Sequence, residues 1–491
     1  MPDVNPWQPP AQQPEGPGSG LPEQWPVPAG AGGAGPIGGE HSTLTEPVPP
    51  HSPPAKGRGR LLGAAALAVV LVGGGAGASV ALSSGSGGGA STPSQAVDNM
   101  LQAIQSSDVI GVMDDLAPGE RNAIAPGLQD VFGQLKRIGV LDSTADLQHI
   151  TGFSASFHGY STSTRQINSS LAAVTLTGGS SAASLDPNQL PLGSYFKSLA
   201  VAATTGQVQK SSSSMGPSTF ATVQVGGSWY VSLGYSIAIN ALQSAGKPMT
   251  PPAGAIIPAG ADSPQDAVTA MFTSVSNLDL QSLIADLDPG EMAALDAYAP
   301  LFIGPAQRSL DTAKGQVSIS FDLPTMRTEQ ISSGTLVKLG GLGVHIKTAS
   351  MSIDAANGCE TIVMSGHTVH TCGAAAGLGN GSATGKELVQ AMPAPVRPIL
   401  QRFIDNPPDA GIVTSEVNGK WYLSPTRALL QAVNAYLADL KPGDIQTVIA
   451  NAHGVDQGFM SFLNKEGQAV MGATSPLLGA TRQGALVGGA L

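Results

Sequence analysis

The stretches TPSQAVDNM, residues 92–100, and SPQDAVTAM, residues 263–271, are two versions of one helix start, 171 residues apart. The match continues without a gap to Glu120 and Glu291, each preceded by Pro-Gly, and gives ten identities in 29 positions. Self-similarity at a fixed offset is the signature of an internal repeat. The sequence therefore predicts two related units in tandem.

Helix capping explains why these positions recur. We expect Thr92 and Ser263 to be N-caps, because a hydroxyl accepts a hydrogen bond from an N–H group of the first turn, and the following proline has no N–H to satisfy. Glu120 and Glu291 stand at the third position of a later helix, where a carboxylate satisfies free N–H groups and the helix dipole. This position favours structural caps over the alternative, a repeated catalytic carboxylate.

A second matched pair closes each unit. The sequence VGGSWYVS at residues 225–232 corresponds to VNGKWYLS at residues 417–424. Gly-Gly and Asn-Gly are typical hairpin turns, and the residues after them favour strands. Large aromatic side chains usually anchor a core, and we expect this role, in preference to ligand stacking, for Trp229, Tyr230, Trp421 and Tyr422.

The sequence between these blocks is rich in Ser, Thr, Val and Gly, and residues 317–323 alternate between apolar and polar side chains. Each unit is therefore predicted to be α+β, with helices first and a curved antiparallel sheet after them. The predicted boundaries are 92–246 for the first repeat, 247–261 for a Pro-rich linker, 262–437 for the second repeat, and 438–491 for a C-terminal helix and flexible tail.

The N-terminal part of the chain differs in character. Residues 1–60 hold 15 of the 38 prolines and are predicted to be a disordered cytoplasmic tail. Residues 61–82 contain no charge and follow a basic cluster, which is typical of one transmembrane helix with the N-terminus in the cytoplasm. A cleaved signal peptide is the alternative, although its apolar run is normally shorter. Residues 83–91 would then be a linker.

This segment sets the expected location and contacts of the chain. We expect a single-pass protein of the cell membrane, which contacts lipid through residues 61–82 and places its C-terminal domains outside the cytoplasm. Gly73 and Gly77 form a Gly-x-x-x-Gly pair within the segment. Such pairs allow close approach of two helices, so the pattern suggests a homodimer.

Both cysteines, Cys359 and Cys372, lie in the second unit. In an oxidising compartment their spacing predicts a disulfide across a hairpin, worth about 3 kcal/mol in the chain-entropy account. The alternative is a metal site that includes His367 and His370. On a strand, however, His370 and Cys372 share a face that His367 does not, so a tetrahedral site would need a bend and Cys359.

Composition narrows the function classes. Only 12% of the residues are charged, and 34 acidic residues outnumber 23 Lys and Arg, which argues against a nucleic-acid partner. A hydrophobic fraction of 42% is sufficient for folded cores. Nucleophile-elbow, zinc-protease, P-loop and dinucleotide-binding motifs are missing, so we predict no catalytic residue, metal or cofactor.

Together, the [ST]-P-x-x-A-V-x-x-M, L-x-P-G-E and G-x-W-Y motifs resemble the cystatin-like domains of the nuclear-transport-factor-2-like superfamily, as in actinobacterial membrane-anchored proteins of uncharacterised function. The resemblance covers residues 92–437, twice over. It implies helices packed into the mouth of a curved sheet, with a cone that can hold a ligand. The sequence departs from the pattern of this superfamily in two respects. A helical pattern follows each Trp-Tyr strand, and the Asp/His pair of the enzymatic members is missing.

The expected function is that of a membrane-anchored extracytoplasmic protein without catalytic activity. It would bind a small apolar ligand or scaffold a cell-envelope complex with a partner protein. The alternatives are a hydrolase or isomerase that uses the cones, and an envelope sensor that signals through the Pro-rich tail. An apolar cavity of about 300 Å³ or more would favour ligand binding.

Overall fold

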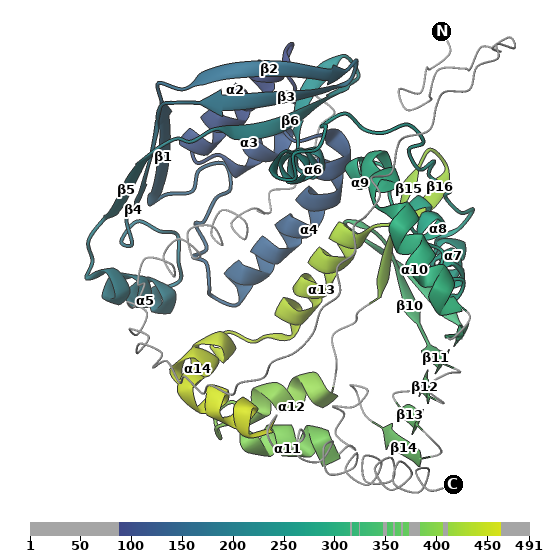
Figure 1. Cartoon of the computed structure of the whole chain (residues 1–491). Coiled ribbons are helices and arrows are strands. Elements are labelled where there is room, and N and C mark those ends of the chain that lie inside the picture. Colours follow the sequence, from purple (N-terminus) through teal and green to yellow (C-terminus); the bar gives the residue numbers. More distant parts are fainter. Residues whose placement is uncertain are drawn as a thin grey trace, which may run out of the picture. The chain divides into compact units, whose positions relative to one another are not determined.

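The computed structural model describes residues 88–314, 317–323, 325–346, 351–356, 359–364, 367–372, 383–405 and 411–462 (Figure 1). Every described element belongs to one compact unit of the chain. Residues 1–60, which we expected to be a disordered tail, lie outside the described residues, as does the chain after residue 462.

No helix in the described part of the chain is long and apolar enough to cross a membrane. The longest of these helices, α4 (Pro118–Arg137), has 20 residues but carries charges at both ends. The predicted fold, which begins with a transmembrane helix, is therefore corrected. The described ranges form a mixed helix-and-sheet fold and contain no membrane-spanning helix. The predicted span, residues 61–82, and the pair Gly73 and Gly77 lie outside them.

The first repeat contains helices on either side of two antiparallel sheets. Its strands are β1 (Phe153–His158), β2 (Ser161–Asn168), β3 (Leu171–Thr177), β4 (Ser180–Leu185), β5 (Gln209–Ser214), β6 (Ser218–Val225) and β7 (Ser228–Ser232). They form the sheets β2-β3-β6-β7 and β1-β4-β5. Its other helices are α2 (Pro93–Gln105), α3 (Val109–Asp114), α5 (Ser194–Thr204) and α6 (Leu233–Ser244).

The second repeat follows the same order with additions. Its strands are β8 (Ile319–Asp322), β9 (Met326–Ile331), β10 (Gly334–Leu339), β11 (Gly341–Ile346), β12 (Met351–Ala356), β13 (Cys359–Met364), β14 (His367–Cys372), β15 (Ile412–Val417) and β16 (Lys420–Leu423). They form the sheets β16-β15-β10-β9 and β14-β13-β12-β11-β8. The helices are α7 (Pro264–Ser276), α8 (Leu280–Ala285), α9 (Ala293–Tyr298), η1 (Ala299–Leu301), α10 (Ile303–Lys314), α11 (Ala383–Ala391), α12 (Arg397–Asp405), α13 (Pro425–Asp439) and α14 (Asp444–Ala450).

Two sheets in each repeat replace the one curved sheet that the resemblance implied, so the expectation of cystatin-like domains is corrected. In the first repeat the division occurs after β3, where Gly178 and Gly179 have φ angles of 69° and 78°. Glycine adopts such angles without steric cost. A Cβ on Gly179 would lie 2.4 Å from the carbonyl oxygen of His158, so this turn directs the chain into the second sheet.

Both repeats hold their first segment against the Trp-Tyr strand through the same bridges. Ala90 and Ala261 form antiparallel bridges with Trp229 and Trp421, respectively. Ala261 follows Ala90 by 171 residues, which is the offset of the sequence repeat. Parallel bridges follow the same offset, joining Leu116 to Val231 and Leu287 to Leu423. The backbone register therefore repeats along with the sequence.

The two tryptophans contribute differently to their cores. Trp229 is 7% exposed and packs with buried residues of α2 and β3. Trp421 is half-buried, and the core of the second repeat instead contains Phe272 and Phe321, whose ring centroids are 4.8 Å apart. The aromatic residues of this core cluster therefore come from α7 and β8.

The two tyrosines occupy matching positions. A Cβ on Gly89 would lie 2.6 Å from the ring of Tyr230, and one on Gly260 would lie 2.4 Å from the ring of Tyr422. Each tyrosine ring thus covers a glycine that precedes the first helix of its repeat. A side chain at either glycine would displace the ring.

The backbone of the expected cysteine hairpin is present, with β13 and β14 as its two strands. Cys359 and Cys372 are opposite residues in the antiparallel pair β13–β14. No disulfide-bonded cysteine pair is found among the described residues, so the predicted disulfide is corrected. The six paired positions of this ladder hold the hairpin through backbone hydrogen bonds, which do not require a covalent link.

Candidate functional site

The two hydroxyl residues at the helix starts accept hydrogen bonds from their own first turns. Thr92 Oγ1 lies 3.2 Å from the backbone nitrogen of Gln95, and Ser263 Oγ lies 3.1 Å from that of Asp266. These contacts satisfy one N–H group at the start of α2 and one at the start of α7.

The two glutamates contact distant helices rather than the first turns of their own. Glu120 accepts hydrogen bonds from the N–H groups of Leu233 and Gly234, at 2.8 and 2.9 Å, and from the hydroxyl of Ser232, at the start of α6. Burial raises the pKa of Glu120, and these hydrogen bonds oppose that shift. Each glutamate therefore fastens the helix that follows its Trp-Tyr strand.

Glu291 makes the equivalent contacts in the second repeat. It accepts hydrogen bonds from the hydroxyl of Ser424 and from the N–H of Thr426, at the start of α13. The sequence pattern indicated a capping role for both glutamates. It could not identify the helix that is capped, because the donors lie more than 110 residues further along the chain.

The two repeats pack through equivalent helices in reciprocal pairs. Helix α4 of the first repeat packs along α13 of the second, and α6 of the first packs against α9 of the second (Figure 1). Helix α4 begins with Pro118-Gly119-Glu120, and α9 begins two residues after Glu291. Because α6 and α13 also both follow a Trp-Tyr strand, the contacts resemble those across a two-fold axis. Gly119 and Gly290 meet there, and a Cβ on Gly119 would lie 2.2 Å from the Gly290 carbonyl oxygen.

A buried polar cluster breaks this equivalence. Arg427 Nη1 lies 2.7 Å from Asp288 Oδ2, and the Ser415 hydroxyl donates to the same carboxylate at 2.5 Å. All three residues are buried. The corresponding positions of the first repeat hold an apolar set that packs in one cluster: Ala117, Val223 and Tyr235.

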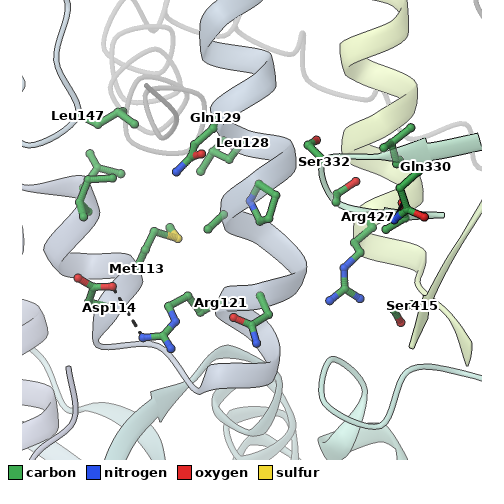
Figure 2. A pocket seen from close by; sticks show the side chains of 18 of the residues that line it. Met113, Asp114, Arg121, Leu128, Gln129, Leu147, Gln330, Ser332, Ser415 and Arg427 are labelled. Carbon is green, nitrogen blue, oxygen red and sulfur yellow. Dashed lines mark hydrogen bonds and ion pairs between the residues drawn. The ribbon is translucent and has the colours of Figure 1, made fainter. Parts of the chain in front are cut away.

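A cavity of about 390 Å³ lies between the repeats (Figure 2). Helices α3 and α4 form one side, and the β9–β10 turn, β15 and α13 form the other. The Ser332 hydroxyl donates to Asp130 and fastens the turn to α4. The apolar part of the lining includes Val109, Ile110, Met113, Leu128 and Leu147.

The polar part of the lining is balanced in charge. Arg121 and Arg427 face the cavity together with Asp114 and Glu416. Arg121 Nη1 lies 3.7 Å from Asp114 Oδ1, as the dashed line in Figure 2 shows. Equal numbers of cations and anions attract no net charge, so this lining suits a neutral ligand with hydrogen-bonding groups.

The cavity is not where the resemblance placed a ligand. In the first repeat, the space between α2 and its four-stranded sheet is filled by side chains that include Val97, Leu101, Val174 and Trp229. Sequence reasoning missed the lining because it comes from two repeats. The usable signal was that Ser415 and Arg427, which flank the matched block 417–424, stand where the first repeat has Val223 and Tyr235.

Asp296 is a further buried acid beside this interface. Its side-chain Oδ1 has no hydrogen-bond partner among the described residues, and the residue is 7% exposed. Burial, and to a lesser extent the neighbouring Asp288, raises the pKa of Asp296 to about 7. The folded protein therefore binds a proton at Asp296 more tightly than the unfolded chain does.

The substitution Asp296→Asn tests this shift. Because the folded pKa is raised, the contribution of Asp296 to stability is complete below pH 4 and is lost as the pH rises towards 7. One pKa unit corresponds to about 1.4 kcal/mol, so with a shift from 3.8 to about 7 we expect the variant to gain about 4 kcal/mol over the wild type between pH 4 and 8.

Urea unfolding at a series of pH values measures this difference. Asp115, Glu120 and Asp286 also have raised pKa values, so they too make the free energy of unfolding fall as the pH rises. This contribution is the same in both proteins and cancels when the variant is compared with the wild type. A difference that stays constant from pH 4 to 8 would contradict the prediction.

No family model, curated protein or solved structure matches this chain. The described residues also contain no group of three or more His, Cys, Asp and Glu side chains that could hold a metal ion. Membership of the nuclear-transport-factor-2-like superfamily therefore stays a prediction.

Proposed function

We propose that this protein is a non-catalytic binding protein whose ligand occupies the cavity between the two repeats. The cavity volume of about 390 Å³, with a wall of aliphatic side chains, carries the proposal. This volume lies within the usual range for small-molecule sites, which are mostly apolar with a few polar groups that orient the ligand.

The chemistry of the lining defines the ligand class. The aliphatic wall on α3 and α4 accepts an apolar group, while Asn122, Gln129 and Gln330 supply amide donors and acceptors. Together with the balanced charges, this lining favours a neutral molecule that has one apolar end and one hydrogen-bonding end.

Scaffolding of a protein complex is a second candidate, supported by a different observation. Ile237 on α6 and Leu429 on α13 are at equivalent positions, and their exposed fractions are 73% and 65%. Val433 and Tyr436 extend the exposed apolar row along α13. Exposed apolar rows are typical of docking faces for other proteins. The enzyme and sensor alternatives have no comparable support among the described residues.

A series of neutral n-alkanols, from butanol to octanol, tests the cavity with the full chain. A ligand that binds only the folded state raises the thermal midpoint by mass action. Each added CH₂ group contributes about 0.8 kcal/mol while it still finds apolar wall, so we expect the stabilisation to grow with chain length and then to level off.

The matched variants are Ala125→Leu, which adds three carbon atoms inside the cavity, and Ala241→Leu, at an exposed position of α6. The first variant should lose the chain-length effect and the second should keep it. An equal response of wild type and Ala125→Leu to every alcohol would refute ligand binding in this cavity and leave scaffolding as the better proposal.

A further inference from the structure

We infer that the occupant of this cavity is an extended peptide segment that inserts one methionine-like, unbranched apolar side chain. The inference rests on the proposed function, because the peptide would use the same cavity. The evidence for this inference lies on the opposite side of the pseudo-two-fold axis, where the chain fills the equivalent space with its own residues.

The equivalent space is recognisable residue by residue. The cavity residues Asn122 and Pro126 correspond to Ala293 and Ala297 at the offset of 171. Ser415 and Arg427 correspond to Val223 and Tyr235, counted from the matched Trp-Tyr pairs. The Ser332-Ser333 turn between β9 and β10 corresponds to Ser169-Ser170 between β2 and β3. All four apolar counterparts belong to one packed cluster, which also includes Ile167 and Leu171 beside the second turn.

Met249 is a buried member of that cluster. It comes from the segment after α6 and packs with Tyr235, Ile239 and Tyr298. Its backbone carbonyl accepts a hydrogen bond from the Tyr298 hydroxyl at 2.5 Å. The protein thus already holds a methionine of a non-helical segment at one of two equivalent positions.

The segment after α13 cannot do the same for the open cavity. Lys247-Pro248 after α6 is matched by Lys441-Pro442 after α13, two residues later in the register counted from the Trp-Tyr pairs, and the residue after the proline is Met249 in the first case and Gly443 in the second. Helix α13 also has 15 residues where α6 has 12. The longer helix carries the following segment beyond the cavity, where Leu440 and Ile445 pack on the last turns of α4.

The open cavity also presents groups that suit a peptide backbone. Pro126 has no N–H, so the carbonyl of Asn122 lacks its donor from the next turn of α4. Both residues line the cavity, as do the amides of Gln129 and Gln330. These acceptors and donors can pair with the N–H and C=O groups on either side of an inserted side chain.

Two positions of α4 carry smaller side chains than their counterparts in the second repeat, and one of them, Ala125, lines the cavity. Gly127 of α4 corresponds to Tyr298, and Ala125 corresponds to Asp296. A Cβ on Gly127 would meet the Cβ of Leu430 at 2.7 Å, so α13 approaches α4 closely at this point. The tyrosine that covers Met249 on one side therefore has no equivalent on the other.

A synthetic peptide of residues 245–253, AGKPMTPPA, is the direct probe and is titrated into the full chain by calorimetry. We expect saturable binding, and binding of similar strength when methionine is replaced by norleucine. A peptide with glycine at this position, as in Lys441-Pro442-Gly443, should bind at least about tenfold more weakly. Ala125→Leu should abolish binding, and Ala241→Leu should leave it unchanged.

The outcomes separate the inference from the proposed function. If the alkanols stabilise the protein but the methionine peptide does not bind, the cavity holds a small molecule and the peptide inference fails. If neither the alkanols nor the peptide binds, both fail. Peptide binding that persists in Ala125→Leu, or that is equal for methionine and glycine, also overturns the inference, because the side chain would not enter this cavity.

Discussion

Replacing Gly119 with alanine should destabilise the folded protein by about 3 kcal/mol, because the new methyl group would overpack a contact between two backbones. Its Cβ would lie 2.2, 2.4 and 2.5 Å from the carbonyl oxygen, carbonyl carbon and Cα of Gly290. Neither backbone segment can move easily, since Glu120 and Glu291 fasten the adjoining residues to α6 and α13.

Two other glycines provide controls for this experiment. Gly133 lies in the same helix, and a Cβ there meets nothing within 4 Å, so Gly133→Ala should stabilise by up to about 1 kcal/mol through helix propensity. Gly290→Ala should be less harmful than Gly119→Ala, because its Cβ has its closest contact at 3.1 Å. Urea unfolding of the three variants checks the order, and a Gly119→Ala midpoint equal to that of the wild type would show that the repeats do not meet at this glycine.

The buried pair Asp288–Arg427 carries the second large prediction. Removal of one partner leaves a buried charge unpaired, which typically costs about 3 to 5 kcal/mol. Asp288→Ala should cost this amount, since Arg427 would keep only its contacts with Ser424 and, at 3.9 Å, with Glu291. Denaturant unfolding near neutral pH measures the loss.

The first repeat supplies the matched control for this substitution. The triple variant Asp288→Ala, Ser415→Val and Arg427→Tyr copies the apolar set Ala117, Val223 and Tyr235. Replacing a buried ion pair by a packed apolar set is often neutral or stabilising, so the triple variant should recover most of the loss. If it proves less stable than Asp288→Ala alone, the two sites are not equivalent and the two-fold comparison is wrong at this point.

The helix starts were predictable because their cause is local. Thr92 and Ser263 contact N–H groups three residues away, and hydroxyl caps followed by proline indicate such contacts directly. The hydrogen-bond donors to Glu120 and Glu291 are brought close by the tertiary structure. They lie so far along the chain that a local sequence pattern contains no information about them. The same limit applies to Trp421, which has the sequence context of Trp229 but leaves its core to Phe272 and Phe321.

The errors of the sequence interpretation also have physical causes. Alternation of apolar and polar residues predicted strands, but it contains no information about which strands share a sheet, and Gly178-Gly179 divides them into two. Spacing placed Cys359 opposite Cys372 correctly, while a covalent bond depends on more than opposition in a ladder. The cavity escaped prediction because α4 and α13 meet only after both repeats have folded.

The pairing of α4 with α13 also determines when this protein can finish folding during synthesis. The first residues of these helices, Pro118 and Pro425, are separated by about 300 positions. At a ribosomal rate of about 5 to 20 residues per second, the apolar face of α4 waits roughly 15 to 60 seconds for its partner. During that time it is available to chaperones, or to another nascent chain of the same protein.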